Sequence, residues 1–385
     1  MSFLEVEIER ILPGGYGLAH SDGHTVFVSL AAPGDRLRVR VERQQGNVLF
    51  ASIDEILVAS PDRVEPPCPY FGRCGGCDFQ QLTYEKQLAA KAEIIRDCLH
   101  RIARLEELPE IVVTPSPRDW RYRMRAMWQI DRDEQTIGYY ERGSRRVCDV
   151  ANCAVLVPQL EQTLERVRAT DWQEFPPDLK HLDIVAGDNG VSLAPAFAGF
   201  ETAELELKIR DEIYNYSAEA FFQINPGLLA PLIEFALHEA TGEAAVDLYC
   251  GVGLFTLPLA RRFARVTGVE GNSVAAGFAR RNLRRAGLEN VRVVNAGVAE
   301  WIRDRSLQTD FVLLDPPRAG AESAVIKGIV DARAQRVTYV SCDPATLARD
   351  LKKLFAGGHV MESLLAFDLF PQTHHVETVV RLHLA

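Results

Sequence analysis

The chain has 385 residues, of which 47% are hydrophobic and 25% are charged, and these proportions exclude a largely disordered or fibrous protein. Its 43 Lys and Arg residues against 53 Asp and Glu residues give a formal net charge of -10, which argues against a protein that binds nucleic acid over its whole surface. The start MSFLEVEIER lacks a signal sequence, and no apolar run reaches the roughly 18 residues that span a membrane. We therefore expect a cytoplasmic protein of two or three domains that makes no membrane contact.

The first predicted domain covers residues 1–60. Apolar and polar residues alternate in this region, for example at Val26–Val28 and Leu37–Val41, and glycine or aspartate turns separate the runs. This period of two predicts strands, and the short spacing predicts a small antiparallel barrel. A proline-rich linker from Pro61 to Pro67 follows it.

The second predicted domain covers residues 61–215 and mixes helices with strands. Apolar residues at helical spacing predict an amphipathic helix from Tyr84 to about Leu105, with Lys and Arg on its opposite face and Cys98 in its core. Arg121, Arg123 and Arg125 then occur at alternate positions, which on a strand would form one basic face suited to RNA phosphates. The alternative is a solvated face balanced by nearby acidic residues.

A group of cysteines opens this domain. Cys68, Cys74 and Cys77 lie close together with two glycines between the last two, so the chain can fold around an inorganic centre. A reducing cytosol disfavours disulfides and shifts clustered thiols toward metal binding. Three thiolates need a fourth ligand, for which Cys148 and Cys153 compete, and the spacing alone allows either an iron–sulfur cluster or zinc.

The third predicted domain covers residues 216–385 and has the alternating pattern of a parallel sheet wound by helices. The strand-like runs are residues 244–249, 265–269, 291–294, 311–314 and 337–340. Ligands of such sheets bind outside the carboxyl ends of the strands, so the residues just after each run are the candidates for a site.

Three of these strand ends suggest a nucleotide cofactor. Gly251 and Gly253 follow the first run and allow a sharp turn close to a ligand. Glu270 follows the second run, where its carboxylate can accept hydrogen bonds from a ribose, and Asp315 follows the fourth run. The cofactor is thus a dinucleotide or an adenosyl compound. The third glycine of a dinucleotide motif is missing, which disfavours a nicotinamide dehydrogenase.

A cysteine follows the last run. Cys342 lies just before a predicted helix, whose positive amino end would lower the pKa of the thiol and make it a nucleophile. Asp315-Pro-Pro-Arg318 precedes it, and Phe370-Pro-Gln-Thr-His-His-Val-Glu377 follows it with a carboxylate and two imidazoles.

The motifs DPPRAG, YVSCDPAT and FPQTHHVE, in this order, resemble those of the RNA uracil-5-methyltransferase family, and DLYCGVG and FQIN also look like family segments. The N-terminal barrel resembles the TRAM module of many members. One departure is Asp343, where members commonly have Asn. The resemblance implies a Rossmann-like class I methyltransferase domain, an N-terminal TRAM or OB-like barrel, and a central α+β domain that holds a metal cluster.

The resemblance also implies roles for single residues. S-adenosylmethionine would contact Gln223, Tyr249, Glu270 and Asp315 beside the glycine loop, Cys342 would add to carbon 6 of uracil, and Glu377 would remove the proton from carbon 5. Cys153 would join Cys68, Cys74 and Cys77 around a [4Fe-4S] cluster that braces the fold or faces RNA. Arg318 is expected to anchor the site, and His374 and His375 to be structural.

The implied substrate is a uridine in RNA. We expect the enzyme to be a monomer. Ribosomal RNA of the large subunit (23S) is the first expectation, and transfer RNA is the alternative. Cytosine-5 methylation uses the same thiolate addition, but the FPQTHHVE ending favours uracil. An alternative from another class is a non-catalytic iron–sulfur protein that binds RNA or acts as an assembly factor.

Overall fold

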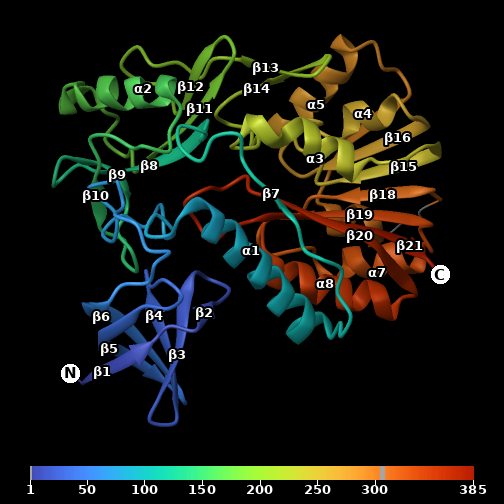
Figure 1. Cartoon of the computed structure of the whole chain (residues 1–385). Coiled ribbons are helices and arrows are strands. Elements are labelled where there is room, and N and C mark those ends of the chain that lie inside the picture. Colours follow the sequence, from blue (N-terminus) through green and yellow to red (C-terminus); the bar gives the residue numbers. More distant parts are fainter. Residues whose placement is uncertain (1, 304–307) are drawn as a thin grey trace.

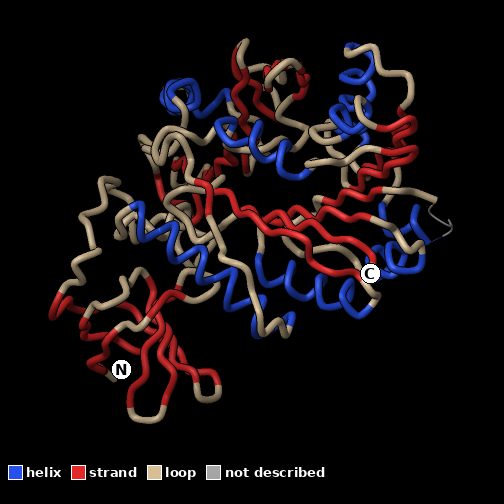
Figure 2. Tube along the Cα trace, turned by 45° about the vertical axis from the view of Figure 1, so that its right-hand side comes forward, coloured by secondary structure: helices blue, strands red, loops and turns tan. Residues whose placement is uncertain are grey.

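The computed structural model describes residues 2–303 and 308–385, which form four β-sheets with helices packed mainly around the largest one (Figure 1). The N-terminal sheet lies at one end of the molecule in both views, and helix α1 (Tyr84–Cys98) runs from it along the large sheet (Figure 2). No helix in the described ranges is long and apolar enough to cross a membrane.

The N-terminal sheet has six strands in the order β1-β5-β6-β4-β3-β2. Their bounds are β1 Phe3–Glu7, β2 Arg10–Ile11, β3 Tyr16–Ser21, β4 His24–Ser29, β5 Arg36–Gln45 and β6 Val48–Val58. Alternate residues such as Val26, Val28, Leu37 and Val39 form its core, as the period of two predicted. The expectation of an entirely antiparallel barrel was wrong, because β4 pairs with β6 in parallel.

The predicted helix after the linker is present, and its regular α-helical part ends at Cys98. Residues Leu99–Ala103 continue it as a π-helical turn, and Arg104 closes the turn with a left-handed φ of 64°. Cys98 is buried in the core, as predicted. Lys91 was expected on the polar face but is fully buried, where it forms an ion pair with Asp368. The buried face of α1 thus contains one charged residue, Lys91, whose partner Asp368 lies 277 positions away in the sequence.

A five-stranded sheet in the order β10-β9-β8-β11-β12 and a hairpin of β13 and β14 follow. The bounds are β8 Arg125–Asp131, β9 Thr136–Tyr140, β10 Val147–Asp149, α2 Pro158–Arg168, the 3-10 turn Trp172–Glu174, β11 His181–Gly187, β12 Gly190–Ala194, β13 Leu205–Ile209 and β14 Glu212–Tyr216.

The predicted basic face on this sheet was wrong for two of its three arginines. Tyr122, Met124 and Ala126 are buried, so the alternation itself is correct. Arg123 also turns inward, and the Arg125 guanidinium donates to the carbonyls of Ala218 and Ala220. Only Arg121 of the three is exposed, so this segment does not present a continuous basic surface.

The large sheet has eight strands in the order β17-β16-β15-β18-β19-β21-β20-β7. The strands are β7 Val113–Thr114, β15 Gly242–Leu248, β16 Phe263–Glu270, β17 Val291–Asn295, β18 Phe311–Leu314, β19 Arg336–Ser341, β20 His359–Phe367 and β21 Glu377–Leu384. All five predicted strand runs are confirmed, and their strands are parallel. The sheet is mixed rather than wholly parallel, because β21 runs antiparallel between β19 and β20.

Helices cover both faces of this sheet, and two hydrophobic clusters fill the space between. The helices are the 3-10 turn Pro226–Leu228, α3 Leu229–Ala236, α4 Thr256–Ala260, α5 Ser273–Arg285, α6 Val298–Arg303, α7 Ser323–Asp331 and α8 Pro344–Ala356. Side chains of α3, α4 and α5 pack with one cluster, and those of α6, α7 and α8 with the other. Figure 1 shows α3, α4 and α5 on one side of the sheet and α7 and α8 on the other. The first cluster continues without a break into the five-stranded sheet, so both share one core.

Candidate active site

Residues from five neighbouring strands meet at one edge of the large sheet. The carboxyl ends of β16, β15, β18 and β19 lead to Glu270, Tyr249, Asp315 and Cys342, respectively. β21 is antiparallel to these strands, so its first residue, Glu377, lies at the same edge. A reversed strand therefore brings the acidic end of the FPQTHHVE motif to the parallel strand ends.

The loop after β15 has the backbone of a tight turn. Tyr249, Gly251 and Gly253 have positive φ values of 62°, 54° and 96°. A Cβ added at Gly251 would meet no heavy atom within 4 Å, so the loop leaves open space there for a ligand. The Glu270 carboxylate fixes this loop, since it accepts from the Gly251 N–H at 2.9 Å and from the Asn272 N–H at 2.7 Å. This arrangement fits an adenosyl cofactor laid across the strand.

Gln223 enters the site from the segment that follows β14. Its Nε2 donates to Asp315 Oδ2 at 3.3 Å, which links two of the predicted cofactor contacts. Phe221, two residues earlier, is 60% exposed although its neighbour Phe222 is buried. An exposed aromatic ring beside such a site offers a stacking surface for a base.

Cys342 and Glu377 both lie next to the last residue pair of strands β19 and β21. Ser341 pairs with Thr378 there, Cys342 follows Ser341, and Glu377 precedes Thr378. The Glu377 carboxylate is close enough to raise the pKa of the Cys342 thiol. The Glu377 side chain is 2% exposed, and its Oε1 has no hydrogen-bond partner among the described residues.

Burial and the charges at this edge favour the protonated thiol of Cys342. Burial and the nearby carboxylates of Glu377 and Asp315 raise the pKa of Cys342 to about 12. The expected lowering of this pKa by the amino end of α8 was therefore wrong. One reason is Asp343, which caps α8 with its own carboxylate by accepting from the Thr346 N–H at 2.8 Å. Asp343 therefore caps the helix as an asparagine, the residue that family members commonly have at this position, would also do.

Two carboxyl groups at this edge favour their neutral forms. Burial raises the pKa of Asp315 to about 7, and burial together with the Asp315 charge raises the pKa of Glu377 well above its usual range. The guanidinium of Arg318 lies close enough to oppose the shifts at Glu377 and Cys342. Burial, His374 and Arg318 lower the pKa of His375 to about 2, so this imidazole is neutral.

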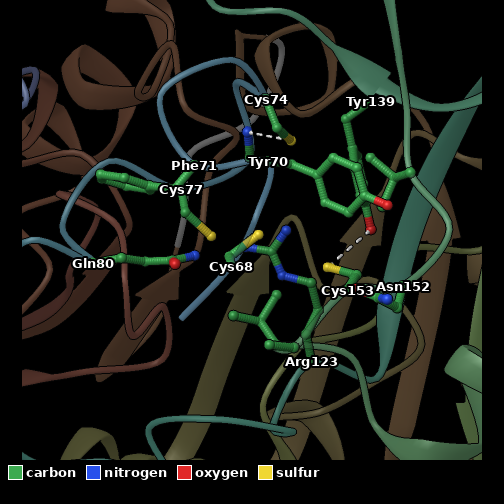
Figure 3. Close-up of a pocket in the computed structure, with 14 residues that line it drawn as sticks. Cys68, Tyr70, Phe71, Cys74, Cys77, Gln80, Arg123, Tyr139, Asn152 and Cys153 are labelled. Carbon is green, nitrogen blue, oxygen red and sulfur yellow. Dashed lines mark hydrogen bonds between the residues drawn. The ribbon is translucent and has the colours of Figure 1, made fainter. Parts of the chain in front are cut away.

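The four cysteines predicted as metal ligands line one pocket, together with Arg123 and Tyr139 (Figure 3). Cys148 is buried in β10 and does not contribute to that lining, although it lies close enough to Cys74 to help raise the pKa of that thiol. None of the eight cysteines forms a disulfide. In the described ranges no three His, Cys, Asp or Glu side chains are grouped as ligands of a metal ion.

The pocket contains a buried cation. The Arg123 guanidinium lies near Cys77 and Cys153, and its Nε has no hydrogen-bond partner among the described residues. Burial raises the pKa of Cys77 to about 12 and that of Cys74 to about 11, so a bound cation would be needed to hold them as thiolates. Four thiols beside a buried guanidinium fit an anionic thiolate-ligated centre.

Sequence reasoning missed three features of the site. Nothing in the amino-acid pattern indicated that Phe221 is exposed, because Phe221 and Phe222 together form an apolar pair. The Tyr249 hydroxyl donates to Glu322, which no motif marks. His374 forms a hydrogen-bonded pair with Asp78, which lies beside Cys77 in the chain. The sequence shows that Asp78 is next to the candidate metal ligand Cys77. It does not show that Asp78 pairs with His374, which lies 296 residues further along the chain.

Two family models match this chain, one near each end. The family model described as tRNA (Uracil-5-)-methyltransferase matches residues 198–384, and the TRAM domain model matches residues 2–53. The structure resembles the tRNA (uracil-54, C5)-methyltransferase of Pyrococcus abyssi in complex with S-adenosyl-L-homocysteine, with a TM-score of 0.76, 25% identity, and coverage of 98% of this chain and 100% of that one.

Among curated proteins, the 23S rRNA (uracil(1939)-C(5))-methyltransferase RlmD of Chromohalobacter salexigens is 34% identical, over 98% of this chain and 88% of that protein. RlmD of Pseudomonas putida is 33% identical, over 97% and 92%. An uncharacterized RNA methyltransferase of Gloeobacter violaceus is 33% identical, over 98% and 95%. These relatives span nearly the whole chain, and the chain therefore belongs to the RNA uracil-5-methyltransferase family.

Proposed function

We propose that this RNA (uracil-5-)-methyltransferase methylates carbon 5 of a uridine in 23S ribosomal RNA, with Cys342 as nucleophile and Glu377 as general base. The observation that carries the proposal is that Cys342 and Glu377 lie next to the last β19–β21 residue pair, where the Glu377 charge acts on the Cys342 thiol. Residues at neighbouring strand ends support a cofactor site beside them, and S-adenosylmethionine supplies the methyl group.

The chemistry explains why a thiol and a carboxylate are needed together. Carbon 5 of uracil is too weak a nucleophile to accept a methyl group directly. Addition of the Cys342 thiolate to carbon 6 turns the ring into an enolate, and carbon 5 then takes the methyl group from the sulfonium of S-adenosylmethionine, which leaves as S-adenosylhomocysteine. Glu377 removes the proton left on carbon 5, the electron pair restores the double bond between carbons 5 and 6, and the sulfur leaves.

The raised pKa of the thiol fits a resting enzyme that becomes reactive only with substrate. The nearby carboxylates favour a protonated thiol when RNA is absent. A cationic cofactor beside Asp315 would stabilise the ionised carboxyl and thiolate forms. We assign the cofactor contacts to Gln223, Tyr249, Glu270 and Asp315 and to the glycine loop, and base stacking to Phe221.

The assignment to ribosomal RNA draws on the two RlmD relatives, whose names specify 23S rRNA. Transfer RNA is the second candidate, because the solved relative of Pyrococcus abyssi is named for it. For the test, RNA from a strain lacking the gene is incubated with the protein and labelled S-adenosylmethionine, and nucleosides are mapped by mass spectrometry. We expect one 5-methyluridine in 23S rRNA. Label in transfer RNA alone would favour the second candidate, and label in neither RNA would contradict the proposal.

We further propose the division of the chain into residues 1–60, 61–215 and 216–385. The TRAM match over residues 2–53 supports the first part as an RNA-binding module. The burial of the Arg123 guanidinium and the hydrogen bonds of Arg125 within the protein leave less of the second part free for RNA. One strand of the second part, β7, pairs with β20 of the third, so these two parts are closely joined.

The cysteine pocket is proposed to hold a [4Fe-4S] cluster through Cys68, Cys74, Cys77 and Cys153. The set is all thiol, which would suit a four-iron cluster, and these four side chains would supply its thiolate ligands. The cluster would be a structural brace, because uracil methylation transfers no net electrons. No step of the reaction depends on it.

Protein purified without oxygen is expected to be brown and to contain about four iron and four sulfide per chain. A Cys153→Ser variant should lose most of both, because a serine oxygen replaces one thiolate. The matched control is Cys148→Ser, which removes a buried thiol outside the pocket lining and should keep them. Zinc without sulfide in the parent protein, or equal loss in both variants, would contradict the assignment.

A further inference from the structure

The loop that leads into Glu377 is held by side chains from the central part of the chain. This loop, residues 368–376, connects β20 to β21. Lys91 of α1 forms an ion pair with Asp368 and donates to the carbonyl of Phe370 at 3.0 Å. The Tyr122 hydroxyl donates to the carbonyl of Pro371 at 2.8 Å. These contacts fix the first half of the loop.

The middle of the loop is bound from two directions. The Gln87 side-chain amide donates to Gln372 Oε1 at 2.9 Å, and its carbonyl accepts from the Gln372 N–H at 2.9 Å. On the other side, the N–H groups of Asp78 and Phe79 both donate to the Gln372 carbonyl at 3.0 Å. The segment that begins at Cys77 is therefore bonded directly to the loop.

The second half of the loop is held by one side chain, Asp78. Its Oδ1 accepts from the His374 N–H at 2.8 Å, and its Oδ2 lies 2.5 Å from His374 Nδ1. The turn before β3 closes over this pair, because a Cβ added at Gly15 would lie 3.2 Å from His374 Cβ and 3.3 Å from Asp78 Oδ2. Three remote segments thus meet at His374, three residues before Glu377.

Glu377 depends on this loop for its position. Its Oε1 has no hydrogen-bond partner among residues 2–303 and 308–385, so the side chain is directed mainly by its backbone. Pairing with Phe367 holds the backbone on the strand side. On the other side the backbone follows residues 374–376, where Asp78 binds His374 and Val376 is buried in the core.

We propose that Asp78 and His374 are positioning residues which hold Glu377 in register with carbon 5 of the target uracil. The inference rests on the proposed role of Glu377 as general base. Methyl transfer itself does not use Glu377, so the pair acts on the later step. In that step the carbon 5 proton moves to the Glu377 carboxylate, the carbon 5 to carbon 6 double bond re-forms, and the bond from carbon 6 to Cys342 breaks.

The test compares Asp78→Ala with Asp97→Ala. Asp97 also makes one ion pair between remote segments, with Arg10 at 3.0 Å, and its side chain is 15% exposed against 13% for Asp78, but it does not contact the loop. A displacement of about 1 Å can cost up to about 100-fold in rate, so we expect Asp78→Ala to lower kcat by about 10-fold or more. The KM values for RNA and cofactor should stay unchanged, and a methylated protein–RNA adduct should accumulate on denaturing gels.

His374 provides a second measurement. In His374→Asn, the side-chain amide nitrogen replaces Nδ1 and should restore the bond to Asp78, so this variant should retain most of the parental kcat. His374→Ala should behave like Asp78→Ala, and the double variant should be no slower than either single variant. Equal rates for the Asn and Ala variants would overturn the inference.

Two controls separate this inference from the assignments it depends on. Metal content is measured for every variant, and its loss in Asp78→Ala would overturn the inference in favour of a role in folding the cysteine pocket. Glu377→Gln is assayed in parallel. An adduct with Glu377→Gln but none with Asp78→Ala overturns the positioning role alone, whereas no adduct with Glu377→Gln overturns the base assignment and the inference with it.

Discussion

A Cys342→Ala variant is expected to lose methyl transfer by about 10⁴-fold or more, because no other group can activate carbon 5 of the ring. RNA binding and S-adenosylmethionine binding should persist, since the cofactor contacts and the barrel are untouched. The measurement is transfer of labelled methyl groups to RNA, with binding of both ligands followed separately. Folding should be retained, because the substitution removes only one sulfur atom from a partly exposed side chain.

The matched control for this variant is Cys98→Ala. Burial also raises the pKa of the Cys98 thiol, but Cys98 is the last residue of α1 and is buried in the hydrophobic core, and it belongs to none of the strand ends that form the site. It should keep the parental rate. Substrate RNA containing 5-fluorouridine adds a positive test, because fluorine cannot leave carbon 5 as a proton does. The parent protein and Cys98→Ala should form a stable adduct with this RNA, and Cys342→Ala should not. Residual activity of Cys342→Ala near the parental level would exclude a thiolate mechanism.

A Glu377→Gln variant is expected to stop after methyl transfer. The amide cannot accept the carbon 5 proton, so the methylated ring stays bonded to Cys342 and a protein–RNA adduct accumulates that carries the label. Release of tritium from carbon 5 of the uracil should fall by about 100-fold or more. The fold should tolerate the change, because the raised pKa of Glu377 makes this carboxyl neutral in the free protein and glutamine has a similar shape.

Glu362→Gln is the control for that variant. Glu362 lies on the neighbouring strand β20 and forms an exposed ion pair with Arg381, away from the strand ends. Its substitution should change neither turnover nor adduct level. If Glu377→Gln turned over normally, the base would have to be another group, and Asp315 with its pKa of about 7 would be the first to examine.

Much of the catalytic half could be predicted from sequence, because strand periodicity and the strand-end rule act locally. The five apolar runs became parallel strands, and Glu270, Asp315 and Cys342 lie where their ends meet. Glu377 joined them for a reason that periodicity does not contain, namely the reversed direction of β21. The family motifs supplied that residue, whereas the local pattern did not.

The fates of charged side chains could not be predicted in the same way. Lys91 and Arg123 stand in patterns typical of surface residues, yet both are buried because their partners come from remote parts of the chain. The pKa of Cys342 was expected to fall with a helix end nearby. It rises, because burial and three acidic groups outweigh that effect. Such balances depend on tertiary neighbours and not on spacing.

The pairing of β7 with β20 has a consequence for how the chain folds during synthesis. Residues 113–114 form the outermost strand of a sheet whose other strands lie between residues 242 and 384. The N-terminal barrel contains all its own strand partners and can fold as soon as it leaves the ribosome. Helix α1 and the segment after it must wait until almost the entire polypeptide has been translated, so nascent chains that end before residue 359 should expose this region to proteases.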